Sequence, residues 1–135
     1  MQTAPGEPLH ATLMISDPGL DDDEREGIAR QLFLELLDGD LEGVAVHRPT
    51  NATSGGAKSL GATILGVIGV LISANGLAAF FGYLGERSRG REIAVELERG
   101  GDKIRLTART QEEFVLAYNA AVRLMEGERK LEGEP

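Results

Sequence analysis

The chain contains no cysteine and no tryptophan among its 135 residues, and aromatic residues supply only 4% of them. The absence of cysteine excludes disulfide bonds, thiolate zinc sites and cysteine nucleophiles. It is also consistent with a protein that works in a reducing compartment. Basic residues are also scarce, with 14 lysines and arginines against 22 acidic residues and a formal net charge of −8. Because no basic stripe is available to neutralise phosphates, we expect no nucleic acid as a partner.

Residues that carry catalysis or bind metals are equally scarce. The two histidines, His10 and His47, lie beside different predicted strands, and neither has a second ligand at a metal-binding spacing. The acidic cluster 21–24 lacks the ligand spacing of a calcium loop and fits a helix N-terminus better. Residues 55–59 precede an apolar segment as a phosphate loop does, but alanine replaces both glycines that the motif requires. We therefore expect no catalytic, cofactor-binding or metal-binding residues and no enzyme.

Hydrophobic periodicity predicts a β-α-β order for the first part of the chain. Residues 11–16 alternate between apolar and polar side chains, which is typical of a half-buried strand. Residues 21–39 follow with apolar side chains at helical spacing, and Asp21 is the expected N-cap. Val44 and Val46 mark a second short strand. We expect the two strands to be parallel and joined by a right-handed crossover.

The last part of the chain predicts a β-hairpin and a helix. Residues 92–98 and 103–109 both alternate, and two glycines separate them. The first of these strands is acidic on its outer face and the second is basic, so their charges should pair across the ladder. Thr110 and Glu113 form a capping-box signature ahead of apolar side chains at helical spacing.

Between these parts, residues 59–85 contain no charged residue, and residues 64–72 form a dense aliphatic run. We expect a long apolar helix here. Small residues recur along it at alternating four- and three-residue steps, and they form the expected helix-contact surface. These helix-interface residues are Ala62, Gly66, Gly69, Ser73 and Gly76.

This helix is apolar on all sides, which leaves three interpretations. It is split near Asn75 and Gly76 into a helical hairpin within the core, or it spans a bilayer, for which about 20 apolar residues suffice. In the third interpretation its surplus apolar face drives self-association or docks an effector. A membrane span would place the first two strands and the hairpin on opposite sides of the bilayer, where neither half has enough core to fold alone.

The predicted fold is α+β, with a four-stranded mixed sheet in β-α-β-α-β-β-α order, helices packed largely on one face, and a long apolar central helix. We expect one interaction domain over residues 9–126, between a flexible lead-in over 1–8 and a charged tail over 127–135. Residues 1–8 contain no basic residue and no apolar core, so we expect no secretory signal and a cytoplasmic location, with the membrane as the alternative.

Several of these features together resemble one known family. They are the order of elements, the strand 44–49 that ends in His-Arg-Pro, the Gly55–Gly56 loop, the small-and-aliphatic helix and the hairpin 91–109. Over about residues 9–126 the chain is similar to the effector-associated constant component family, type one, of bacterial conflict systems. The resemblance implies a non-catalytic component encoded with, or fused to, effectors such as trypsin-like or caspase-like proteases. We therefore expect an adaptor that recruits or regulates an effector protein and forms a homo-oligomer through the apolar helix.

Overall fold

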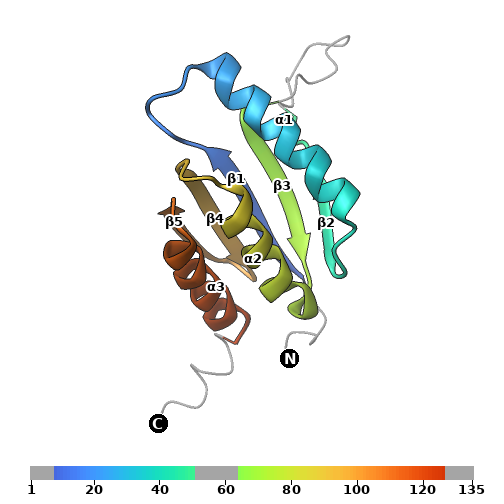
Figure 1. The fold of residues 1–135 in the computed structure, drawn as a ribbon. Helices are drawn as coiled ribbons and strands as arrows, with labels where there is room; N and C mark the ends of the chain where they lie inside the picture. Colours follow the sequence, from blue (N-terminus) through green and yellow to red (C-terminus); the bar gives the residue numbers. More distant parts are fainter. Residues whose placement is uncertain (1–7, 51–63, 127–135) are drawn as a thin grey trace, which may run out of the picture.

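The structure is a computed structural model that describes residues 8–50 and 64–126. These residues form five strands and three α-helices, and all three helices lie on the same face of one sheet (Figure 1). The elements are β1 (Leu9–Ile15), α1 (Asp22–Gly39), β2 (Val44–His47), β3 (Val67–Ile72), the short 3-10 helix η1 (Ala74–Gly76), α2 (Leu77–Arg87), β4 (Ile93–Arg99), β5 (Asp102–Ala108) and α3 (Gln111–Met125).

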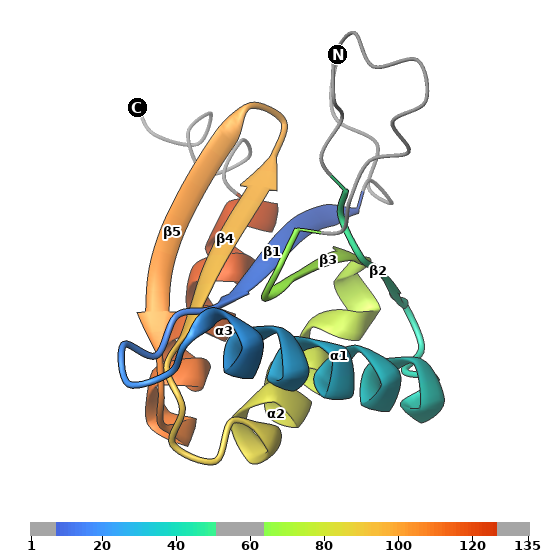
Figure 2. The ribbon, with the colours of Figure 1, turned by 90° about the horizontal axis from the view of Figure 1, so that it is seen from above.

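The sheet has the strand order β2-β3-β1-β4-β5, and every neighbouring pair is antiparallel. β1 and β2 run in the same direction, as expected for strands joined by a helix, but β3 lies between them. The elements from β1 to β4 follow the β-α-β-β-α-β order of the ferredoxin-like arrangement. β5 and α3 extend this unit at the edge beside β4 (Figure 2). The arrangement by itself implies no particular function.

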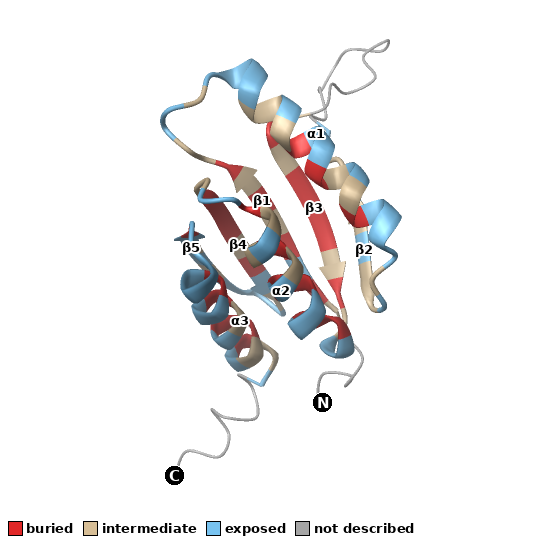
Figure 3. Ribbon diagram, viewed as in Figure 1, coloured by how far each residue is buried: buried red, intermediate tan, exposed pale blue. Residues whose placement is uncertain are grey.

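The core lies between the sheet and the three helices, where buried positions of the strands face buried positions of the helices (Figure 3). Alternate residues of β1 are buried while the residues between them are partly or fully exposed, which is the pattern of a sheet covered on one side. The largest fully buried side chains are Phe80, Phe114, Leu9, Leu13, Ile68, Ile72, Leu84, Leu97, Val70 and Val95.

The predicted four-stranded mixed sheet is wrong, because the sheet has five strands and all of them pair antiparallel. The additional strand, β3, comes from the aliphatic run that predicted a helix. This strand lies between β1 and β2, and four of its six residues are buried. A strand buried in this way reads as a continuous apolar run, which periodicity alone does not distinguish from a buried helix.

The predicted long apolar helix is also wrong. From residue 64 to residue 85 the chain forms a turn, β3, η1 and most of α2, so the apolar segment changes structure several times. Residues 59–63 of the predicted helix lie outside the described residues. Within 8–50 and 64–126, no helix combines the length and the apolar character that crossing a membrane requires.

Local signals at the helix starts and in the hairpin are confirmed. The Asp21 carboxylate accepts a hydrogen bond from the Glu24 N–H at 2.8 Å, and Thr110 caps α3 in the same way through Glu113. β4 and β5 pair across the two-glycine turn. Both turn glycines have positive φ angles, 59° and 94°, which is the conformation that a tight hairpin turn requires.

Candidate functional site

The residues predicted to form a helix-contact stripe do not share a helix face. Gly66 lies in the turn before β3, Gly69 lies within β3, and Ser73 and Gly76 lie where β3 passes into η1. Ala62 lies outside the described residues.

Packing within the domain accounts for three of these positions. The His47 ring covers Gly69, and a β-carbon at Gly76 would lie 2.8 Å from the carbonyl oxygens of residues 42 and 43. The Ser73 hydroxyl donates to the Gly43 carbonyl at 3.2 Å. These contacts are made within the domain, so they account for the three positions without a partner helix.

The two histidines lie on the helix-free face of the sheet and do not form a metal site. His10 pairs in register with Leu71 and Glu98, whereas His47 pairs with Gly69. Among the residues that the structure describes, no three histidine or acidic side chains are placed to hold a metal ion together. Residues 55–59, whose sequence was compared with a phosphate loop, lie outside the described residues.

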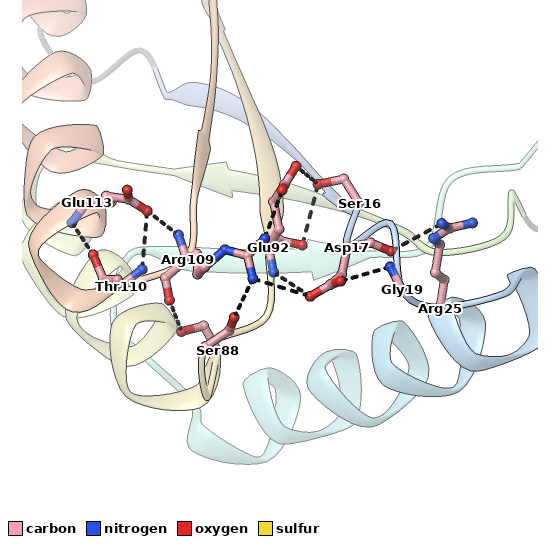
Figure 4. A network of polar contacts seen from close by, with 10 residues as sticks. Ser16, Asp17, Gly19, Arg25, Ser88, Glu92, Arg109, Thr110 and Glu113 are labelled. Carbon is pink, nitrogen blue, oxygen red and sulfur yellow. Dashed lines mark hydrogen bonds and ion pairs between the residues drawn. The ribbon is translucent and has the colours of Figure 1, made fainter.

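A network of polar contacts ties the loop after β1 to the start of β4 and the end of β5 (Figure 4). The Asp17 carboxylate accepts hydrogen bonds from the Gly19 N–H at 3.0 Å and the Glu92 N–H at 3.3 Å. These two backbone donors, in that order, lower the pKa of Asp17, and the positive charge of Arg109 acts in the same direction. Arg109 also contacts Glu92 at 3.1 Å. These hydrogen bonds and ion pairs fix the loop after β1 against the start of β4 and the end of β5.

A second polar cluster joins α1 to the end of β2 and the start of β3. The Arg48 guanidinium donates to both carboxylate oxygens of Glu26, at 2.6 and 3.1 Å, and also to the Val67 carbonyl at 2.8 Å. The Gly66 N–H donates to Glu26 at 2.8 Å. The two side chains are only 12% and 14% exposed. The Arg48 hydrogen bonds, followed by the Gly66 N–H, lower the pKa of Glu26, so this carboxylate stays ionised as a structural group.

An apolar groove between α2 and α3 is the candidate functional site. It has a volume of about 320 Å³. Phe81 and Phe114 are buried and form its floor, while Val115 stands at its rim with 56% of its surface exposed. The residues that line this α2–α3 groove are Ala78, Phe81, Gly82, Gly85, Gln111, Phe114, Val115 and Tyr118.

Gly82 leaves the α2 side of the groove open, because it has no side chain. A β-carbon at Gly82 would meet no atom of the described structure within 4 Å, so packing inside the domain does not require glycine there. Glycine within a helix costs about 1 kcal/mol relative to alanine. Gly85 differs, because a β-carbon there would lie 3.3 Å from Gln111 and 3.7 Å from Phe114 of α3. The missing side chain at Gly82 therefore leaves room on the outer surface of α2.

Sequence reasoning missed this groove. The small residues Ala78, Gly82 and Gly85 of α2 repeat the four- and three-residue steps but are out of phase with the predicted stripe, whose continuation from Gly76 would reach Phe80 and Tyr83. Val115 and Leu116 are also apolar beside the predicted buried face of α3, and they are 56% and 64% exposed. Two adjacent apolar residues outside the buried face were the available signal.

Comparison with known proteins identifies no family. No family model and no curated protein matches the chain. Among solved structures, the chain matches a phage SAM lyase in complex with S-methyl-5′-thioadenosine, with 14% sequence identity over 80% of this chain and 95% of that one. The TM-score of 0.30 is too low for this likeness to support an argument about fold or activity.

Proposed function

We propose that the protein is a non-catalytic interaction domain, an adaptor that binds an effector protein of a bacterial conflict system through the α2–α3 groove. The groove is the observation that carries this proposal. The resemblance in sequence layout supplies the conflict system and the kind of effector, a trypsin-like or caspase-like protease. Nucleic acid has no part in the proposal, since the chain has a net charge of −8.

The shape and chemistry of the groove fit a helix of the partner. Amphipathic helices bind by laying an apolar face into a hydrophobic groove. Phe81 and Phe114 are buried beneath the groove and form an apolar floor. Gly82 allows a partner side chain to approach the backbone of α2 closely. Val115, which is 56% exposed, adds apolar surface at the rim of the groove on α3.

The acidic groups of the two polar clusters support the non-catalytic part of the proposal. A general acid or base works best with a pKa near the operating pH. The pKa values of Asp17 and Glu26 are instead lowered, by backbone N–H donors and by the Arg48 guanidinium respectively. Both carboxylates hold neighbouring segments in place.

Self-association remains part of the expectation for an adaptor that brings effectors together. The long apolar helix that was expected to drive it does not exist in the described residues. The mass of the purified protein in solution, determined by light scattering, tests self-association independently of effector binding.

Calorimetric titration of the purified chain with a trypsin-like or caspase-like protease from the same genome, the kind of effector that the resemblance implies, tests the proposed function. Gly82→Trp fills the groove and should weaken binding at least tenfold. Gly27→Trp is the matched control, because Gly27 is an exposed glycine of α1 whose β-carbon would also meet no atom within 4 Å. If both variants weaken binding equally, the groove is not the binding site. If the effector does not bind the wild-type chain, the adaptor role is contradicted.

A further inference from the structure

β5 forms one edge of the sheet, and its outer side is paired with no strand of the described residues. The hairpin register decides which of its backbone groups point outward. The pair Arg99 and Asp102 closes the two-glycine turn, so these residues exchange hydrogen bonds with each other. Opposite pairs in an antiparallel ladder alternate between bonded and non-bonded. The N–H and C=O groups of Lys103, Arg105 and Thr107 therefore point off the edge.

The same three residues point their side chains toward the helix-free face, and all three are exposed. Lys103 and Arg105 give this edge a basic stripe. On the other side of the stripe, β4 places Glu98 opposite Lys103 and Glu96 opposite Arg105. Lys103 contacts Glu96 at 3.7 Å, whereas Arg105 lies within 4.0 Å of no carboxylate in the described part of the chain. A strand that is added outside β5 would therefore lie beside this basic stripe, where Arg105 is available to form an ion pair with it.

On the helix side of this edge, α3 presents one exposed apolar residue, Leu116, with the exposed Glu112 about one turn before it. Leu116 is 64% exposed, and at 100° per residue it lies on the side of α3 away from the groove residues Gln111, Val115 and Tyr118. Those groove residues face α2, so Leu116 lies toward the outer edge of the sheet, above β5. A residue of an added strand that points toward the helices would meet this leucine.

We propose that the β5 edge binds an extended acidic segment of a partner protein by strand addition. Acidic side chains of the segment pair with Lys103 and Arg105 on the helix-free face, and the aliphatic side chains between them pack against Leu116. Backbone hydrogen bonds supply affinity in this mode, and alternate side chains supply specificity. This surface is separate from the α2–α3 groove and does not depend on the function proposed for it.

A second copy of the chain does not fit this edge. Two β5 strands pairing edge to edge would bring basic stripes together, and like charges directly opposite each other destabilise a ladder. The other edge strand, β2, has only four residues and places Ala45 and His47 on the helix-free face. Neither edge strand of the described residues supplies the carboxylates that the basic stripe requires, so pairing of two sheet edges is disfavoured, and the occupant that we propose is a segment of another protein.

Fluorescence anisotropy with a labelled peptide that alternates glutamate and leucine tests the proposal, and a peptide that alternates lysine and leucine is the control. The wild-type chain should bind the glutamate peptide at least tenfold more tightly. Arg105→Ala should weaken binding about two- to fivefold, since cross-strand charge pairs contribute modestly. Methylation of the peptide's alternate amide nitrogens that face β5 should abolish binding.

Gly82→Trp should leave binding of this peptide unchanged, which separates this surface from the groove. A thermal melt of Arg105→Ala establishes that the variant is folded. Equal affinity for the two peptides, unchanged affinity in Arg105→Ala, or binding that survives amide methylation would each overturn strand addition to a basic edge. Absence of binding to the wild-type chain would overturn it as well.

Discussion

The ring of His47 occupies the space over Gly69 that a β-carbon would need, on the helix-free face of the sheet. The two residues are register partners on β2 and β3. Gly69 is therefore small because a cross-strand neighbour covers it, and a contact with a partner helix is not needed to explain it.

Substitution of Gly69 by alanine should displace this ring at little cost. The ring is the far end of an exposed side chain and is free to turn away, so we expect a change in unfolding free energy below about 1 kcal/mol. Urea unfolding measures the stability, and the NMR shift of the His47 Cε1 proton reports the displaced ring. A loss above about 2 kcal/mol would indicate that the ring is fixed in place.

Gly76→Ala should be much more costly than Gly69→Ala. A β-carbon at Gly76 would lie 2.8 Å from the carbonyl oxygens of Glu42 and Gly43, and backbone atoms do not move aside as a side chain does. We expect a loss of about 1–3 kcal/mol, as for other overpacking substitutions. Urea unfolding of both alanine variants in parallel tests the contrast, and equal stabilities would refute it.

Gly82→Ala should stabilise the isolated domain. The new β-carbon meets no atom within 4 Å, and alanine is favoured over glycine inside a helix by about 1 kcal/mol. For a chain of 135 residues the melting temperature should rise by roughly 3–5 °C. Calorimetry measures the rise, and Gly85→Ala is the control, because its β-carbon would press against Gln111 at 3.3 Å. An unchanged or lower melting temperature for Gly82→Ala would mean that glycine serves the stability of α2.

Glu26→Gln should remove a pH-dependent part of the stability. The hydrogen bonds from Arg48 lower the folded-state pKa of Glu26 below its ordinary value of 4.5. The ionised carboxylate therefore contributes stability above that ordinary pKa, and the contribution is lost as the pH falls toward the lowered one.

At neutral pH we expect Glu26→Gln to cost about 1–3 kcal/mol, because the buried guanidinium loses its charged partner. Between about pH 5 and pH 3 the variant's stability should decline less than that of the wild type. Urea unfolding across this range measures both effects. Glu35→Gln is the control, since Glu35 is 35% exposed and lies 3.7 Å from Arg87. Parallel pH profiles for wild type and Glu26→Gln would contradict the assignment.

The sequence by itself determined the elements whose signals are local. The alternation in β1, the capping boxes at Asp21 and Thr110, and the two-glycine turn between β4 and β5 each depend on residues close together in the chain. Side-chain hydrogen bonds to nearby N–H groups and a tight turn form in the same way wherever the segment lies. These elements were predicted without knowledge of the fold.

Only the tertiary structure decided what the apolar segment becomes and where a partner can bind. The residues from Val67 to Ile72 are apolar enough for a helix or a buried strand, and the open positions beside β1 and β2 make them a strand. The α2–α3 groove and the β5 edge depend on which surfaces the packed elements leave uncovered. Long-range contacts set those surfaces, so spacing along the chain does not reveal them.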